Sequence, residues 1–311
     1  MEEHNGTLIV NCIGGLGNQM FAYAAGRSLA RRFNRKLEVV MPPTSHQQWS
    51  GYARPFQLSQ FQIRGTLRQA GFLERLLFSN NRKLKSLQAA AGLLGIELVR
   101  ERHAYRYESE LKLDPARSSA YLNGYWQSAA YAEAVESELR EEFTLRAPLQ
   151  GRNSELARQI SRLACPVSVH VRLGDYAQIS HAGVDGSTRV SQVLPASYFQ
   201  HAFEAVRAAL GEFTPVLFSD EPEKARGLLP ETKQLLLIEG NGAERAYEEL
   251  YLMSLCKHHV IANSSFSWWG AWLNASVEKR VFAPQFWGNT PESYFPDLCP
   301  RGWTLIDNMA A

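Results

Sequence analysis

The sequence has little net charge, no long apolar run and no paired metal-binding acids. Its 33 basic and 31 acidic residues leave a formal net charge of +2, so there is no nucleic-acid footprint in the overall charge. No apolar run approaches the roughly 20 residues that a membrane-spanning helix needs. The first six residues are polar and acidic, and they lack the basic and apolar regions of a secretory signal. We therefore expect a cytoplasmic protein that binds no nucleic acid.

Cysteine and metal-ligand patterns are also sparse. Four cysteines lie far apart and form no CxxC pair: Cys12, Cys165, Cys256 and Cys299. Three of them sit in or beside apolar runs, which favours buried free thiols and fits a reducing cytoplasm. No Asp-x-Asp pair occurs, which weakens the case for a nucleotide site bridged by Mg²⁺ or Mn²⁺. The adjacent His258 and His259 cannot both point at one site from a strand, which argues against a zinc role.

What is present is an ordinary globular composition, with 45% hydrophobic and 21% charged residues. A length of 311 residues suggests one large domain or two of ordinary size. The Pro- and Gly-containing stretch 147–151 is the best linker candidate. We therefore predict a first domain over residues 1–150, a second over 151–290 and a C-terminal tail over 291–311.

The second half alternates between helical and strand patterns. Predicted strands are one that opens at Pro166 and others at 215–218, 234–238, 259–262 and 280–283. Predicted helices cover 154–162, 195–210, a stretch from 221, 244–256 and a stretch from 266. Repeated alternation of this kind predicts an α/β fold with a doubly wound parallel sheet.

The first half opens in the same way, with a strand at 8–13, a Gly-rich turn and a helix from about Asn18 to Arg32. The glycines let the backbone approach a ligand, and the helix start offers bare N–H groups. The dinucleotide fingerprint is incomplete because Met20 stands where its last Gly belongs. An NAD-dependent oxidoreductase remains a rival interpretation, since Glu38 lies close to the acidic position that it requires.

Three further elements are predicted in the first half: a strand at 37–41, a strand at 121–128 and a helix at 131–143. A fourth stretch, Phe72 to Gly95, has a helical pattern with apolar and basic residues interleaved. It is either a core helix with a solvated face or a surface helix that contacts a membrane or a partner. Peripheral contact with a membrane therefore stays open.

The run from Pro166 to Tyr176 changes character half way along. Its front half is apolar and β-branched, which predicts a buried strand of a parallel sheet. Its back half brings His170, Arg172 and Asp175, which are costly to bury unpaired. An arginine is a planar, permanently charged fork that suits phosphate. The alternative is a structural Arg–Asp pair that closes a loop.

Two other predicted strands of the second half also end in polar residues. Ser219, Asp220 and Glu221 follow one strand, and Asn263, Ser264 and Ser265 follow the other. In a parallel sheet all three ends lie on the same edge, so we expect a single site there.

The turn at 263–265 and the helix start after it offer hydroxyls and free N–H groups with the helix dipole behind them, which suits an anion. A plain hydroxyl N-cap would have the same sequence. Asp220 is either an acceptor for a base or ribose or the N-cap of the next helix. With Arg172 supplying the positive charge, this edge predicts a diphosphate site that needs no metal.

Five segments carry a family resemblance. They are, in chain order, Gly14–Phe21 (GGLGNQMF), Gly124–Ser128 (GYWQS), His170–Tyr176 (HVRLGDY), Phe218–Asp220 (FSD) and Ala262–Trp272 (ANSSFSWWGAW). In this order they resemble the α-1,2-fucosyltransferases of glycosyltransferase family 11. The resemblance spans nearly the whole chain, and its last motif is very specific. Because no membrane anchor is expected, the chain resembles a bacterial member of the family.

The resemblance implies a GT-B-like architecture, in which two Rossmann-like domains face a central cleft. It implies a galactoside 2-α-L-fucosyltransferase that transfers fucose with inversion from GDP-fucose to the 2-hydroxyl of a galactose, with no metal. The second domain would bind GDP-fucose, and the first would lie on the acceptor side. The acceptor would be a galactose-terminated oligosaccharide or a lipid-linked glycan, as in O-antigen biosynthesis.

Residue by residue, the resemblance assigns Arg172 to the donor diphosphate and His170 to the neighbouring donor site. It assigns Ser264 and Ser265, after Asn263, to the phosphate turn. Further binding residues implied in the same way are Asp220, Gly15, Asn18 and Gln19. Many relatives carry a second Arg where this chain has Leu173, whose side chain should point away from Arg172 and pack.

A general base would help the acceptor hydroxyl to attack. Asp175 is the candidate that the sequence offers, but so close to Arg172 it either acts as this base or orients the arginine. Besides the NAD-dependent enzyme, a non-catalytic glycan-binding protein is the second rival. The acceptor and the oligomeric state cannot be inferred from the sequence.

Overall fold

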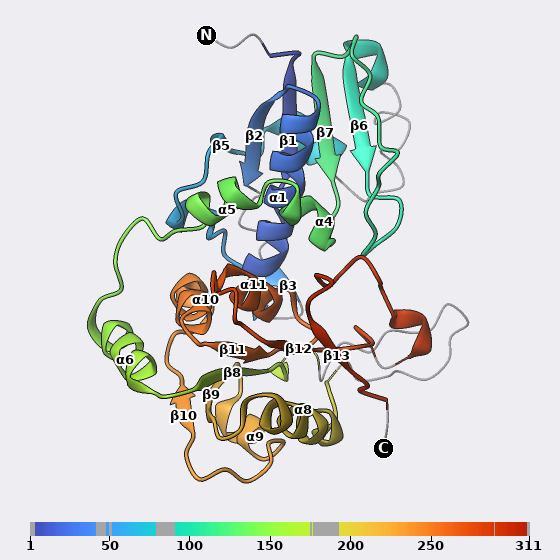
Figure 1. The fold of residues 1–311 in the computed structure, drawn as a ribbon. Helices are drawn as coiled ribbons and strands as arrows, with labels where there is room; N and C mark the ends of the chain where they lie inside the picture. Colours follow the sequence, from blue (N-terminus) through green and yellow to red (C-terminus); the bar gives the residue numbers. More distant parts are fainter. Residues whose placement is uncertain are drawn as a thin grey trace. The chain divides into compact units, whose positions relative to one another are not determined.

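The computed structural model describes residues 4–41, 48–49, 52–78, 91–174, 176, 193–288 and 290–309. The chain divides into two compact units, Met1–Arg146 and Ala147–Ala311. Each unit is built on its own parallel sheet with helices packed against it (Figure 1). None of the helices in the described ranges is both long and apolar enough to cross a bilayer.

The first unit contains a parallel sheet in the order β5-β2-β1-β7-β6. Its strands are β1 (Thr7–Asn11), β2 (Lys36–Met41), β5 (Thr66–Gln69), β6 (Ile96–Arg100) and β7 (Ser119–Asn123), and β3 (Gln48–Trp49) pairs with β4 (Tyr52–Ala53) in a separate antiparallel ribbon. Its helices are α1 (Leu16–Arg32), α2 (Phe72–Leu77), α4 (Ala129–Glu133) and α5 (Glu136–Glu142), with 3₁₀ turns η2 (Leu58–Gln60) and η4 (Ala91–Leu94).

Helix α1 is the main support of this sheet. It packs against β1 and β2, and its Phe21, Ala24 and Ala25 are fully buried. Gly26 lies so close to Val10 and Leu37 that a Cβ there would come within 3.3 Å of both side chains. Arg31 and Arg32 occupy its last turn, where positive charge is favourable next to the helix dipole.

The second unit contains a parallel sheet in the order β10-β9-β8-β11-β12-β13. Its strands are β8 (Pro166–Val171), β9 (Thr214–Ser219), β10 (Leu236–Ile238), β11 (His258–Val260), β12 (Val281–Pro284) and β13 (Thr304–Ile306). Its helices are α6 (Gly151–Arg162), α8 (Ala196–Leu210), α9 (Pro222–Arg226), α10 (Ala246–Ser254) and α11 (Ser265–Leu273), with 3₁₀ turns η5 (Ala243–Arg245) and η6 (Pro291–Ser293).

Both faces of this second sheet are covered. Val167, Val169 and Val171 of β8 point into a cluster with α8, while β9 presents Val216 and Phe218 to α6 and α10. In Figure 1, α8 lies on one side of the sheet and α10 and α11 lie on the other. Helices on both faces of a parallel sheet confirm the predicted doubly wound α/β fold. Strands that are buried on both faces are continuous apolar runs in the sequence, which is why the pattern could be recognised.

Three edge strands were not predicted: β5, β6 and β13. The helix expected from Phe72 to Gly95 ends at Leu77 in α2, and β6 begins at Ile96; residues 79–90 lie outside the described part. The membrane-surface interpretation of that stretch therefore stays a prediction. The segment 291–311, expected as a C-terminal tail, contains β13, which pairs with β12 in the second sheet.

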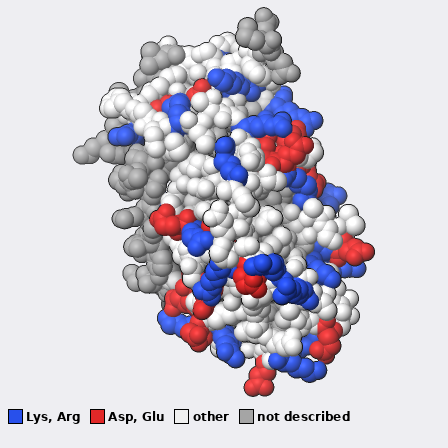
Figure 2. Space-filling model, turned by 90° about the vertical axis from the view of Figure 1, so that its left-hand side faces the viewer, with Lys and Arg blue, Asp and Glu red and all other residues white. Residues whose placement is uncertain are grey.

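Charged side chains are mixed by sign on one face of the molecule. On the face shown in Figure 2, basic and acidic side chains are interspersed. This agrees with the formal net charge of +2.

Candidate functional site

The strand order of the second unit defines one point at which ligands bind in α/β folds. From β8 the chain moves outward to β9 and β10, then returns to the other side of β8 with β11, β12 and β13. The order therefore reverses between β8 and β11. Ligands of open parallel sheets bind at the carboxyl ends of the strands at such a switch point. Arg172 follows β8 and Ser264 follows β11, so both lie at this position.

Arg172 is held by an acidic residue from the neighbouring strand. Its Nη1 lies 2.9 Å from Oδ2 of Asp220, which follows β9, and each side chain is 20% exposed. The other carboxylate oxygen of Asp220 accepts a hydrogen bond from the backbone N–H of Leu173 at 3.0 Å. One carboxylate therefore fixes both the guanidinium and the backbone beside it. Such charge-assisted bonds are roughly twice as strong as neutral ones.

The same guanidinium lies over an aromatic ring. The Arg172 Cζ is 5.7 Å from the ring centroid of Tyr176, and the Tyr176 hydroxyl donates to the backbone oxygen of Asn263 at 3.1 Å. These contacts link the end of β8 to the turn after β11. Leu173 itself is buried in the apolar cluster under α8, as predicted from the alternation of faces.

The turn after β11 caps helix α11. Ser264 is its N-cap, and its hydroxyl accepts from the backbone N–H of Phe266 at 3.4 Å. Ser265 is the first helical residue, and Ser267 is fully buried, where its hydroxyl donates to the backbone oxygens of Ala262 and Ser264. The predicted N-cap is thus present. The start of a helix also carries a partial positive charge that favours an anion.

His170 is the last but one residue of β8 and is 4% exposed. Burial, together with the nearby Arg172 charge, lowers the pKa of His170 to about 3. Its ring is 5.7 Å from that of Phe266, and its buried Nδ1 has no hydrogen-bond partner within the described residues. A neutral imidazole with one uncommitted nitrogen is therefore next to Arg172.

Helix α10 contributes an acid that the sequence did not single out. Burial raises the pKa of Glu249 to about 7; the negative charge of Asp220 adds to the rise, whereas Asn241 and Arg172 oppose it. The charges of Asp220 and Arg172 are thus both close enough to shift the pKa of Glu249. Its sequence signal was an acidic pair, Glu248-Glu249, inside an otherwise apolar helix.

The neighbouring Glu248 has a structural role. Arg245 donates to it from Nε at 2.9 Å and from Nη2 at 2.7 Å, and Asn153 donates at 2.7 Å. Arg245 lowers the pKa of Glu248, and Asn153 lowers it further. Adjacent helical residues point about 100° apart, so Glu248 can pair with Arg245 while the side chain of Glu249 lies in a different environment.

The first unit has its own switch point, between β1 and β7. Gly15 is the N-cap of α1, and its backbone oxygen accepts from the N–H groups of Asn18 and Gln19. Gln19 is buried: its amide donates to the Gly14 and Pro55 oxygens and accepts from the Gln57 N–H. Gln19 thus fixes the loop, and its predicted ligand contact stays a prediction.

The end of β7 faces the same turn. Gln127 donates to Oδ1 of Asn18 at 2.7 Å, and Asn11 of β1 donates to Asn123 of β7 at 3.1 Å. Trp126 has a φ of +55°, an uncommon angle for a bulky residue. Glu101 stabilises this conformation by accepting from the N–H groups of Tyr125 and Trp126, and burial raises the pKa of Glu101.

Asp175 lies outside the described residues, so its role as base or orienting group stays a prediction. Over the described ranges no three His, Cys, Asp or Glu residues gather as a metal site. His259 is buried between Ser168 and Asn274, at 2.7 Å and 2.9 Å, and so serves the core. None of the four cysteines is in a disulfide.

Comparison with known proteins places this arrangement in a family. The profile described as Glycosyl transferase family 11 matches residues 102–296. The O-antigen biosynthesis glycosyltransferase WbnK of Escherichia coli is 29% identical over 286 residues, which cover 88% of this chain and 92% of that protein. The alpha-1,2-colitosyltransferase of Escherichia coli is 27% identical over 305 residues, covering 96% and 99%.

Solved structures agree on the architecture. The fucosyltransferase NodZ from Bradyrhizobium matches with a TM-score of 0.50 at 15% identity, covering 86% of this chain and 92% of that one. A structure of the NodZ alpha-1,6-fucosyltransferase co-crystallised with GDP matches with a TM-score of 0.51 over the same shares. At this identity the likeness concerns the fold, and it confirms a GT-B-like pair of Rossmann-like units.

Proposed function

Since the chain belongs to glycosyltransferase family 11, and is a fucosyltransferase-like member of it, we propose that it transfers L-fucose from GDP-fucose to the 2-hydroxyl of a galactose residue. Transfer inverts the anomeric carbon and needs no metal ion. The observation that carries the proposal is the Arg172–Asp220 pair at 2.9 Å, next to the N-cap of α11 at the switch point. The names of the relatives support a sugar donor and a role in O-antigen assembly.

Cleaving the bond between fucose and phosphate leaves negative charge on GDP and cation character on the sugar ring. Arg172 and the start of α11 stabilise the departing diphosphate. Because this charge grows as the bond breaks, the interaction is stronger in the transition state than in the bound substrate. Asp220 holds the guanidinium in place beforehand, so little reorganisation is needed during the reaction.

The carboxylate of Glu249 is the candidate hydrogen-bond acceptor for the guanine ring of GDP-fucose. Guanine presents two adjacent N–H donors on one edge, and a carboxylate can accept both. Binding to these donors favours the charged form, so GDP lowers the pKa of Glu249 from its value near 7. Neutral His170 keeps one nitrogen for the donor, and Asp175 remains the proposed base for the acceptor hydroxyl.

The domain roles follow from the same assignment. The unit that carries Arg172 binds GDP-fucose, and the unit that carries Asn18 lies on the acceptor side. The rival dinucleotide site is disfavoured because Glu38, its expected ribose ligand, pairs with Arg68 at 2.9 Å. Where Rossmann enzymes place their last Gly, Met20 is fully buried in α1.

A second donor is favoured by one observation, the match to a colitosyltransferase over 99% of its length. Colitose lacks the 3-hydroxyl of fucose. Transfer of colitose from its GDP ester uses the same diphosphate site, so the two functions differ only in contacts to that hydroxyl.

The test is release of GDP from GDP-fucose with a panel of β-galactosides, followed by linkage analysis of the product by NMR. We expect release only when a galactoside is added, and an α-1,2 product from the β-linked donor. Running GDP-colitose in parallel decides between the donors. A product with another linkage, or GDP release that needs Mn²⁺, would contradict the proposal, and NADH binding without GDP binding would favour the oxidoreductase.

A further inference from the structure

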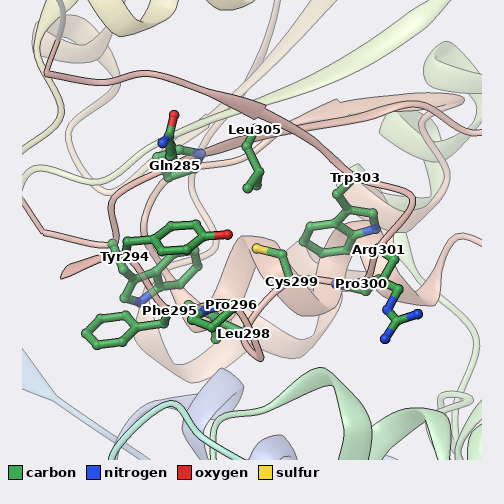
Figure 3. Close-up of a pocket in the computed structure, with 12 residues that line it drawn as sticks. Gln285, Tyr294, Phe295, Pro296, Leu298, Cys299, Pro300, Arg301, Trp303 and Leu305 are labelled. Atoms are coloured by element: carbon green, nitrogen blue, oxygen red, sulfur yellow. The ribbon is translucent and has the colours of Figure 1, made fainter. Parts of the chain in front are cut away.

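The second unit contains a pocket that the donor site does not use. It has a volume of about 200 Å³ and is formed between the end of β12 and the start of β13. Its wall includes four aromatic side chains: Trp287, Tyr294, Phe295 and Trp303. Figure 3 shows the Tyr294 hydroxyl and the Cys299 sulfur pointing toward each other, with Trp303 beyond the sulfur.

The wall of this pocket is rigid. Pro284, Pro296 and Pro300 restrict the backbone around it. Trp268 of α11 donates from its indole nitrogen to the Leu298 oxygen at 2.9 Å, and its ring lies 5.4 Å from that of Trp303. A pocket that exists before a ligand arrives loses less free energy to ordering when it binds.

Polar groups of the lining are uncommitted. Within the described residues, the side chains of Gln285, Tyr294 and Arg301 make no hydrogen bond or ion pair. Burial raises the pKa of the Cys299 thiol to about 12, so this group is neutral. The pocket therefore has an amide and a phenol among its lining groups, around aromatic faces, while the Arg301 guanidinium is directed away from the Cys299 sulfur (Figure 3).

This combination selects one class of ligand. A pyranose has a C–H face that packs on an aromatic ring and hydroxyls around its edge that pair with amide and phenol groups. A lipid chain would leave the amide and phenol unpaired, at a cost in free energy. A phosphate would meet a single cation, Arg301, among the lining residues.

The pocket is tied to the donor site by a direct contact. Asn263, which precedes the N-cap Ser264, donates from Nδ2 to the backbone oxygen of Trp287 at 3.0 Å. The phosphate turn and the pocket wall are therefore held together. We propose that this pocket binds one pyranose ring of the glycan acceptor, other than the galactose that receives the fucose. The proposal rests on the proposed function and deepens it.

The consequence is a preference for longer acceptors. A monosaccharide acceptor such as methyl β-galactoside reaches only the reaction centre, whereas a tetrasaccharide such as lacto-N-tetraose also fills the pocket. Tyr294→Ala removes one stacking face from a side chain that is 46% exposed, so the fold should tolerate it. We expect KM for the tetrasaccharide to rise about 10-fold, with kcat unchanged and with KM for methyl β-galactoside unchanged.

A second pocket variant and a control variant outside the pocket accompany Tyr294→Ala. Gln285→Ala removes the amide and should act in the same direction as Tyr294→Ala. Tyr251→Ala, on α10 outside the pocket and 36% exposed, is the matched control and should leave both KM values unchanged. Equal KM values for the two acceptors in the wild type, or no selective effect of either pocket variant, would overturn the proposal.

A binding measurement separates this proposal from the function on which it rests. Saturation-transfer NMR with the tetrasaccharide and the full chain, without donor, should show contacts that Tyr294→Ala weakens. If the protein releases no GDP from GDP-fucose yet shows these contacts, the proposed function fails and the pocket stands. If a decyl chain or inorganic phosphate binds in a Tyr294-dependent way and the tetrasaccharide does not, the saccharide assignment is wrong.

Discussion

The two units have the same kind of sheet and the same kind of switch point, but they place different chemistry there. In the second unit the strand ends bring together Arg172 and Asp220, whose charges also shift the pKa of Glu249. In the first unit the corresponding contacts run between amides, as from Gln127 to Asn18. In that unit the carboxylate of Glu101 accepts hydrogen bonds from two backbone N–H groups.

Under the proposed function, this difference would let one fold serve two kinds of ligand. A diphosphate needs fixed positive charge in a partly desolvated place, where charged interactions are strong. A neutral sugar is recognised by groups that both donate and accept, which amides do. The architecture is thus shared, and the side chains at the strand ends decide which ligand each unit suits.

The largest effect is expected when the Arg172 guanidinium is removed from the second unit. Arg172→Ala should lower turnover by about 10²–10³, by analogy with the loss of one oxyanion donor. GDP release with a saturating galactoside measures it. Arg162→Ala, at the exposed end of α6, is the matched control and should behave as wild type. Turnover within threefold of wild type in the Arg172 variant would dismiss the assignment.

The next effect tests the partner of that arginine. Asp220→Asn keeps the oxygen that accepts from Leu173 but removes the charge that fixes Arg172. Losing a charge-assisted contact should weaken GDP binding about 10-fold, measured by titration calorimetry. Glu223→Gln, at an exposed position of α9, is the control. Unchanged GDP affinity in the Asp220 variant would show that Arg172 needs no orienting partner.

The two adjacent acids of α10 should respond to pH in opposite directions. The folded-state pKa of Glu249 is raised from 4.5 to about 7, so its contribution to stability is full below 4.5 and is lost as pH rises toward 7. The pKa of Glu248 is lowered from 4.5, so its contribution is present above 4.5 and is lost as pH falls below it.

Thermal unfolding of two variants between pH 4 and 8 measures this. Relative to wild type, Glu249→Gln should gain stability at pH 8 compared with pH 4.5. Glu248→Gln should be destabilised at pH 7, and the gap should narrow as pH falls below 4.5. Parallel curves for the two variants would show that the acids share one environment.

A smaller effect is expected in the first unit. Gln127→Ala removes the amide that donates to Asn18. A neutral hydrogen bond contributes about 1 kcal/mol, so KM for the galactoside should rise by roughly fivefold while GDP affinity stays unchanged. Gln200→Ala, which removes the exposed pair with Glu204 on α8, is the control. A weaker GDP affinity in the Gln127 variant would contradict the proposal that the second unit alone binds GDP.

The smallest expected effect is none. EDTA should leave turnover unchanged, because Arg172 and the start of α11 supply the positive charge that a metal would supply elsewhere. The rate of GDP release before and after chelation measures this. Activity lost in EDTA and restored by Mn²⁺ would transfer the neutralising role from the protein to an ion.

The central strands of the two parallel sheets could be predicted, whereas of their four edge strands only β10 was predicted. β8 and β9 are apolar, β-branched and buried, so their runs stand out in the sequence. The missed strands β5, β6 and β13 lie at the sheet edges, where most of their side chains are partly or fully exposed. An edge strand buries less apolar surface, so its sequence pattern is weak and its pairing partner decides its conformation.

The motifs of the chain already indicate that polar groups gather at the carboxyl ends of three strands, because parallel strands have that edge in common and each apolar run stops at a polar residue. Tertiary structure alone decides which acid meets Arg172, since Asp220 is 47 residues from the Leu173 N–H that it also binds. It also decides that Glu249 has a pKa near 7 while Glu248 titrates lower. Burial and the distances between charges set these properties, and both arise only when segments far apart in the chain pack together.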